Sequence, residues 1–255
     1  MSSSDTLFLG KVIRQFDSLD STNEHLKGML RTSKVAEGTV IIANYQSAGK
    51  GQMGAAWQSS PGLNLLCSTL LQPTFLRPDQ LFSLTQITSL AVIALLEDLG
   101  MNDLRIKWPN DIYSGSRKIA GLLIENNLKG SQLKDVIVGL GLNINEVDFP
   151  VMLKDKATSI RLDTGQSVDI LDILFKYIKN LEQYYLLLKA NKAKAISQQY
   201  ESFLLGKGSK RTFIHASGER FEGIIQGVDQ SGRLMILKER ETHFFLNKEV
   251  QFIIN

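Results

Sequence analysis

The sequence predicts an α+β fold, because strand and helix signals both occur up to residue 205, in runs of strands and runs of helices, and only short strand signals follow. The expected strands of this first part cover residues 12–16, 38–43, 64–71, 104–108, 118–125 and 135–143. The expected helices cover residues 25–31, 78–100, 168–188 and 192–205. The change of pattern near residue 206 predicts a second, smaller part.

Local signals justify these elements in turn. The cap-like cluster Asp20–Asn23 precedes the first helix. The apolar run Gly38–Ala43 is typical of a buried strand. Pro78 opens the longest early helix, since proline is tolerated in a first turn, and Gly100 ends it. Leu84, Ala91 and their helical neighbours form one apolar face of that helix.

The segment Gly206-Lys207-Gly208-Ser209 is the best linker candidate. Short strands are expected beyond it at 211–215, 221–228, 234–237 and 243–246, separated by turns that contain glycine. This pattern is typical of a small β-barrel. We therefore predict two domains, residues 1–206 and 207–255.

The composition excludes several classes of protein. With 43% hydrophobic and 22% charged residues, the chain is an ordinary globular protein, and a net charge of +3 without a dense basic run gives no sign of nucleic-acid binding. Cys67 is the single cysteine and fits a core position in a reducing compartment. Three scattered histidines predict no metal site. No signal peptide or membrane span is expected, so we predict a cytoplasmic protein with no membrane partner.

The most informative motif is Lys107-Trp108-Pro109-Asn110-Asp111, at the end of an apolar strand. Pro109 removes a backbone donor and ends the strand. Asn110 and Asp111 are then expected on a turn, where their side chains can face a pocket. An ordinary strand end is the competing interpretation.

A glycine-rich loop, Gly49-Lys50-Gly51-Gln52-Met53-Gly54, satisfies the G-x-G-x-x-G pattern after a strand. A dinucleotide-binding fold requires a helix at the third glycine, but a turn and a strand follow here, so that interpretation fails. The loop either closes over an anionic ligand, with Lys50 as its cation and Trp57 at its far end, or is a plain surface loop.

A second glycine run, Gly139-Leu140-Gly141-Leu142-Asn143-Ile144-Asn145, ends another apolar strand. Glycines within a strand let another group approach the backbone closely. Asn143 and Asn145 are two residues apart and so share one side of the chain, either at a site or simply in the following turn.

Together these segments resemble the biotin–protein ligases. The matching pieces occur in the family's order over roughly residues 12 to 255: Ser21-Thr22-Asn23, Gln46 with the loop from Gly49 to Trp57, the Lys107–Asp111 motif, Lys118-Ile119-Ala120-Gly121-Leu122-Leu123-Ile124-Glu125, and the second glycine run. The order and spacing carry the resemblance more than any single motif.

The resemblance implies a mixed sheet flanked by helices, related to the lipoate ligases, with an SH3-like C-terminal β-barrel. It implies two substrates, biotin and ATP with Mg²⁺, which react to biotinyl-5′-AMP. It also implies a partner, the biotin carboxyl carrier domain of acetyl-CoA carboxylase or a related enzyme, whose lysine then accepts biotin. A homodimer is compatible with the family.

The resemblance also assigns roles to residues. Lys118 and Lys50 offset the repulsion between the two reacting anions, and Asp111 orients Lys118 or the acceptor amine. Ser21, Thr22 and Gln46 bind the ureido group, Trp57 packs beside the adenylate, and Asn110 and Asn143 read adenine. The remaining expected binding residues are Asn23, Gly49, Gly51, Gln52, Gly54, Lys107, Gly121 and Gly141.

Two departures from the family pattern lead to predictions. Lys50, Gln52, Met53 and Ala55 stand where arginines are common, and the neutral amide of Gln52 does not clamp phosphate as arginine does, so we expect a less tightly held adenylate. About twenty residues precede Ser21, too few for a helix-turn-helix domain, so no sequence-specific DNA binding is expected.

Three other functions compete with this one. A lipoate or octanoate ligase shares the chemistry, but the polar Ser21–Asn23 cluster favours a ureido ligand over an aliphatic chain. A biotin-sensing regulator would need a DNA-binding segment. A non-catalytic carrier-binding module is disfavoured because Lys118 and Asn143 are present.

Overall fold

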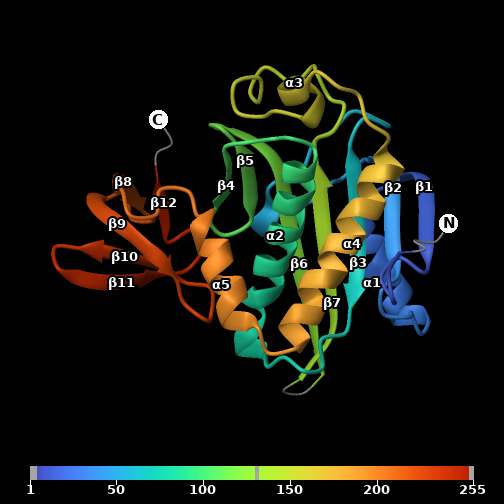
Figure 1. Cartoon of the computed structure of the whole chain (residues 1–255), viewed down its shortest axis with the longest axis horizontal. Helices are drawn as coiled ribbons and strands as arrows, with labels where there is room; N and C mark the ends of the chain where they lie inside the picture. Colours follow the sequence, from blue (N-terminus) through green and yellow to red (C-terminus); the bar gives the residue numbers. More distant parts are fainter. Residues whose placement is uncertain (1–4, 130–131, 253–255) are drawn as a thin grey trace.

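The computed structural model describes residues 5–129 and 132–252 and contains two sheets (Figure 1). The larger, seven-stranded sheet has the order β1-β2-β3-β7-β6-β5-β4 and is mixed, because β1 and β2 are parallel and the other neighbours antiparallel. Its strands are β1 Ile13–Leu19, β2 Val40–Gln46, β3 Leu65–Leu71, β4 Leu104–Lys107, β5 Asp111–Ser114, β6 Arg117–Lys129 and β7 Gln132–Leu142.

Helices cover both faces of this sheet. The helices are α1 Thr22–Thr32, α2 Phe82–Asp98, α3 Ile160–Thr164, α4 Ile170–Lys189 and α5 Ala193–Ser202, with short 3₁₀ turns at Gln52–Gly54 and Pro78–Gln80. On one face, α2 and α4 pack on the main core together with Ile42 and Val138. On the other face, Leu26 of α1 packs against Ile41 and Ile137. Alternate side chains of a strand point to opposite faces, which explains this division.

The second sheet is antiparallel, with the order β11-β10-β9-β8-β12. Its strands are β8 Lys210–His215, β9 Arg220–Val228, β10 Leu234–Lys238, β11 Glu241–Phe245 and β12 Val250–Phe252. It forms the small C-terminal part seen at the left of Figure 1 and agrees with the expected SH3-like barrel.

Hydrogen bonds join the barrel to the larger part. Trp108 Nε1 donates to the carbonyl of Gly232 over 2.9 Å, and the Val228 amide donates to Glu201 Oε1 over 3.2 Å. The chain passes between the two parts at Gly206 and Gly208, both with positive φ. The boundary between residues 206 and 207 falls within this turn and stays a prediction.

The predicted strands and long helices are confirmed in place, with ends that differ by a few residues. Three short elements were not expected, namely β5, β12 and α3. As a result, the expectation for Asp111 is wrong in detail: the turn covers Trp108–Asn110, and Asp111 begins β5, opposite Lys107. A four-residue strand carries too little periodicity to be separated from a turn by its sequence.

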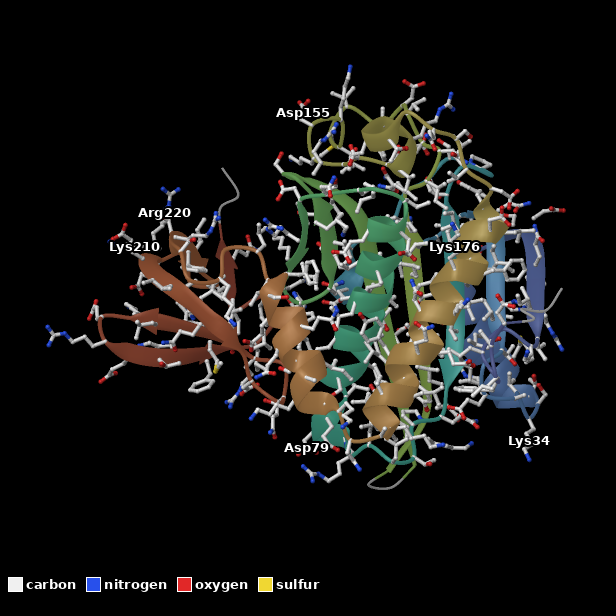
Figure 2. The ribbon with its side chains drawn as sticks, viewed as in Figure 1. Lys34, Asp79, Asp155, Lys176, Lys210 and Arg220 are labelled. Carbon is white, nitrogen blue, oxygen red and sulfur yellow. The ribbon has the colours of Figure 1, made fainter. Side chains whose placement is uncertain are left out.

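The expectation that no stretch approaches a membrane span is also wrong by length and composition. The helical segment Pro78–Asp98 has a mean hydropathy of 1.4 over its most apolar window, but 67% of that window is buried. It packs against α4, α5 and the sheet, which makes it a core helix. Exposed charged side chains surround both parts, as the labelled Lys176, Lys210 and Arg220 show in Figure 2.

Candidate active site

A cavity of about 210 Å³ lies on the α1 side of the large sheet. Most of the predicted site residues line it: Ser21, Thr22, Asn23, Gln46, Lys50, Gly51, Gln52, Trp57, Asn110, Asp111, Lys118, Gly121 and Gly141. They come from segments almost 120 residues apart in the chain. The fold therefore gathers the separate motifs into one place.

One end of the cavity is neutral and polar. The Thr22 amide and hydroxyl both donate to Gln46 Oε1, over 2.7 and 3.0 Å. Ser68 Oγ lies 2.7 Å from Thr22 Oγ1 and also contacts Asn23 Oδ1. Ser21 caps α1 without a side-chain hydrogen bond to the helix, so the helix does not use its hydroxyl. These groups offer both donors and acceptors.

Ser68 is a polar residue that the sequence interpretation missed. It is fully buried in β3 and bonds two of the predicted site residues. The available signal was a hydroxyl residue within the apolar run Leu65–Leu71. A buried hydroxyl in such a run needs a polar partner, which here belongs to the site.

The floor of the cavity consists of strand glycines. A Cβ at Gly139 would lie 2.5 Å from Asn23 Oδ1, and a Cβ at Gly141 would lie 2.4 Å from the Trp57 ring. A Cβ at Gly121 would lie 3.0 Å from the same ring. The expectation that Gly139 and Gly141 permit a close approach is confirmed, and the approaching groups are the Asn23 amide and the Trp57 indole.

The loop that carries Trp57 is folded back on itself. The Trp57 amide donates to the Gly49 carbonyl over 2.9 Å, and Lys50 forms a β-bridge with Ala56. This arrangement places the indole on the glycine floor. Its Nε1 is buried and has no hydrogen-bond partner within the described part of the chain.

The other end of the cavity is charged. Lys118 Nζ lies 2.7 Å from Asp111 Oδ1 and 5.4 Å from the centre of the Trp57 ring. The backbone of Lys118 is held by two hydrogen bonds to the loop after β7: its amide donates to the Lys156 carbonyl and its carbonyl accepts from Thr158. A rigid backbone therefore presents this ammonium group to the cavity.

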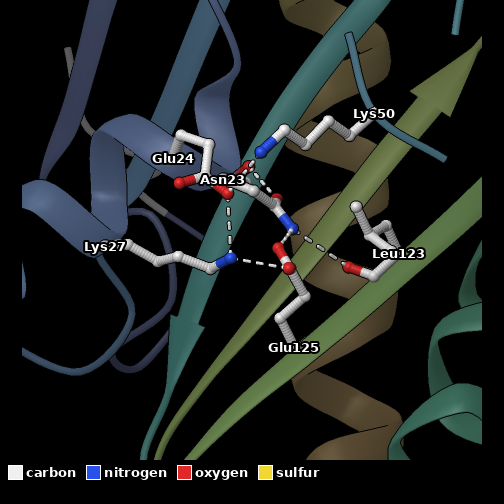
Figure 3. Close-up of polar contacts among 7 residues, drawn as sticks. Asn23, Glu24, Lys27, Lys50, Leu123 and Glu125 are labelled. Atoms are coloured by element: carbon white, nitrogen blue, oxygen red, sulfur yellow. Dashed lines mark hydrogen bonds and ion pairs between the residues drawn. The ribbon is translucent and has the colours of Figure 1, made fainter. Parts of the chain in front are cut away.

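A polar network runs from α1 to the loop cation Lys50 (Figure 3). Glu24 forms ion pairs with both Lys27 and Lys50, and Lys27 also pairs with Glu125 over 2.6 Å. Glu125 in turn accepts a hydrogen bond from Asn23 Nδ2 over 2.7 Å. The network therefore couples the predicted loop cation to the polar end of the cavity.

The C-terminal barrel also contributes to the lining, through Asn247 and Lys248. Asn247 Nδ2 donates to Gln52 Oε1 over 2.6 Å. The sequence interpretation did not include these two residues, because nothing in the local sequence shows that this turn reaches a site in the other domain. Gln52 is thus tied to the barrel.

Four predicted site residues lie outside the lining: Gly49, Gly54, Lys107 and Asn143. Asn143 is buried and donates to the Thr158 carbonyl over 3.0 Å. Lys107 lies over the Tyr113 ring, and burial lowers its pKa. Asn110 lines the cavity, although its amide donates to the Leu122 carbonyl over 2.6 Å. Roles for Asn143 and Asn110 in reading adenine stay predictions.

The predicted core role of Cys67 agrees with the structure. The thiol is buried in β3, and this burial raises its pKa to about 12. A thiol in that state is a poor nucleophile. Among the described residues there is no cluster of three or more histidine, cysteine, aspartate or glutamate side chains that could hold a metal ion.

The profile of the biotin/lipoate A/B protein ligase family matches residues 15–143. The chain belongs to this family. It is 30% identical over 233 residues to the bifunctional ligase/repressor BirA of Bacillus subtilis, covering 91% of this chain and 71% of that protein. It is 27% identical to the biotin–[acetyl-CoA-carboxylase] ligase of Paracoccus denitrificans, covering 77% of this chain and 82% of that protein.

A solved relative has the same fold over nearly the whole chain. The biotin protein ligase of Aquifex aeolicus in complex with biotin and ATP superposes with a TM-score of 0.81 at 28% identity, and the match covers 96% of this chain and 100% of that one. The apo structure of the same ligase gives a TM-score of 0.75. The fold predicted from the resemblance is thereby confirmed, including the small C-terminal sheet.

Proposed function

We propose that this member of the family is a biotin–protein ligase that forms biotinyl-5′-AMP from biotin and ATP and then transfers biotin to a carrier lysine. The observation that carries the proposal is a single cavity with a neutral, hydrogen-bonding end at Thr22 and Gln46 and a cationic end at Lys118. A ureido ring with a carboxylate tail fits that polarity. The named relatives and the Aquifex aeolicus complex support it.

The polar end favours biotin over a lipoyl or octanoyl chain. Thr22 and Gln46 line the cavity, are hydrogen-bonded to each other and keep further donor and acceptor capacity, and the buried Ser68 bonds Thr22 without lining the cavity. An aliphatic chain would leave that remaining hydrogen-bonding capacity unsatisfied, which is costly. A ureido group satisfies it.

In the first step, a carboxylate oxygen of biotin attacks the α-phosphorus of ATP. The new P–O bond forms as the bond to pyrophosphate breaks. Lys118 lies at the charged end of the cavity, where its ammonium offsets the repulsion between the two anions and the charge that develops in the transition state. Trp57 covers the floor on the same side and limits access of water to the product.

In the second step, the neutral amine of the carrier lysine attacks the acyl carbon of the mixed anhydride. The C–N bond forms, the C–O bond to AMP breaks, and the amine loses a proton. Asp111, 2.7 Å from Lys118, is placed to orient that ammonium or the incoming amine. No protein nucleophile is required, because the adenylate is already activated.

Magnesium is expected with ATP. Asp111 is the one carboxylate among the described residues that line the cavity. This donor set fits an ion that is held mainly by the phosphates of its nucleotide, as Mg²⁺ commonly is. The ion would supply charge neutralisation at those phosphates.

Several features of the proposed enzyme rest on the sequence alone. They are a cytoplasmic location and the lack of a membrane partner, whereas a homodimer is compatible with the family and is not decided by the sequence. The acceptor class is a biotin carboxyl carrier domain, in keeping with the name of the Paracoccus denitrificans relative.

Biotin transfer tests this function. The full chain is incubated with biotin, MgATP and a purified carrier domain, and the carrier is followed by intact-protein mass spectrometry. We expect the mass of one biotinyl group to be added, and no addition to a carrier whose acceptor lysine is replaced by arginine. Addition of lipoate but not biotin would refute the substrate assignment.

A further inference from the structure

Glu24 is the branch point of the network in Figure 3. Its Oε1 lies 2.9 Å from Lys27 Nζ and 3.0 Å from Lys50 Nζ. One carboxylate oxygen thus faces two ammonium groups. Only one of these, Lys50, belongs to the cavity lining, while Lys27 and Glu24 do not.

The two lysines differ in how firmly they are held. Lys27 has two carboxylate partners, Glu24 and Glu125, and is 29% exposed. The only ion-pair partner of Lys50 within the described chain is Glu24, and its side chain is 51% exposed. The Lys50 pair is therefore weak enough to be exchanged, whereas Lys27 stays in place.

Glu24 does not become an unpaired charge when Lys50 leaves, because Lys27 remains 2.9 Å away. The hydrogen bonds from Lys27 and Lys50 hold the pKa of Glu24 below its ordinary value, so the carboxylate is ionised at neutral pH. The four charged groups Lys50, Glu24, Lys27 and Glu125 sum to zero. When Lys50 moves from Glu24 to the carboxylate of a ligand, it therefore exchanges one carboxylate partner for another.

We infer that Glu24 is a positioning residue that holds the Lys50 side chain away from the ligand until the ligand's own carboxylate displaces it. This inference rests on the proposed function, since it requires an anionic ligand such as biotin. Glu24 orders the loop cation in the free protein and competes with the ligand for it. The competition lowers affinity for a carboxylate ligand and leaves a neutral analogue unaffected.

The test compares Glu24→Gln with the unaltered full chain by calorimetric titration of biotin and of its neutral amide, biotinamide. Because an exposed ion pair contributes about 0.2–1 kcal/mol, we expect biotin to bind about 1.4- to 5-fold more tightly to the variant. We expect the dissociation constant for biotinamide to stay unchanged. In a Lys50→Met background, the effect of Glu24→Gln on biotin should disappear.

Glu222→Gln is a matched control, because Glu222 forms an exposed ion pair with Lys210 in the barrel, 2.7 Å long. This variant should bind biotin and biotinamide with the same affinity as the unaltered chain. Weaker or unchanged biotin binding in Glu24→Gln would overturn the inference, as would an equal change for biotin and biotinamide. Should Glu24→Gln fail to fold, Lys50→Met alone must weaken biotin and spare biotinamide. If the unaltered chain binds no biotin, the proposed function fails instead.

Discussion

The Trp57 indole packs against Gly141 so closely that a Cβ at position 141 would lie 2.4 Å from ring atom Cε2. The aromatic residue of the glycine-rich loop and the second glycine run are thus two halves of one contact. Because Gly141 has only a hydrogen where other residues have Cβ, the loop can lie directly on the sheet.

Gly141→Ala should therefore displace Trp57 from the floor of the cavity. Overpacking of this kind costs about 1–3 kcal/mol, so we expect biotin affinity to fall by about tenfold, measured by titration. Gly28→Ala is the control, since a Cβ there meets nothing within 4 Å and alanine favours a helix. Equal affinity in both variants would contradict the packing role of Gly141.

Lys118→Ala should remove the charge that opposes repulsion between the reacting anions. Loss of such a group typically lowers the rate about 10²–10³-fold, and we expect that loss in biotin-dependent adenylate formation. Lys118→Arg keeps the charge and should recover part of the rate. Lys210→Ala, an exposed ion-paired lysine of the barrel, should leave the rate unchanged. Full activity of Lys118→Ala would refute the assignment.

Asn143→Ala distinguishes a structural role from an adenine-reading role. Its amide bonds the buried Thr158 carbonyl, so removing it should lower the free energy of unfolding by about 1–3 kcal/mol in urea titrations. A structural role alone leaves the KM for ATP unchanged, whereas a role in reading adenine raises it. Asn102→Ala, at an exposed turn, should have little effect on stability. Unchanged stability with a raised KM for ATP would favour the adenine role.

The Gln52–Asn247 hydrogen bond should slow escape of the adenylate, because it ties the ligand loop to the barrel. A neutral hydrogen bond contributes about 0.5–1.5 kcal/mol, so Gln52→Ala and Asn247→Ala should each speed adenylate release about two- to tenfold. The double variant should release the adenylate at the same rate as each single variant, and a double-mutant cycle detects this. Gln251→Ala is the control, and simply additive effects would argue against a shared contact.

Much of the fold could be predicted because its signals are local. The apolar runs of β2 and β3 and the helical pattern of α2 and α4 can be recognised from their own residues. The short strands β5 and β12 lack a full period and were missed. The position of Asp111 opposite Lys107 was missed with them, since strand pairing depends on the partner strand.

The residues of the candidate site also fall into those that the sequence predicts and those that it does not. Motifs with unusual residues, such as the Lys107–Asp111 segment, could be found in the sequence. Asn110 and Asp111 of that segment line the cavity, whereas Lys107 does not. Asn247 and Lys248 could not, because they reach the cavity only through the docking of the barrel at Trp108 and Gly232. The ion pairs of Glu24 likewise join α1 to a loop more than twenty residues away.

The central claim is that the cavity activates biotin with ATP. The most direct test is ATP–pyrophosphate exchange by the full chain in Mg²⁺, with biotin and lipoate run side by side. We predict exchange that depends on biotin and is absent with lipoate. Exchange with lipoate alone would show that lipoate, and not biotin, is the substrate. If the folded protein supports exchange with neither ligand, the ligase function itself is contradicted.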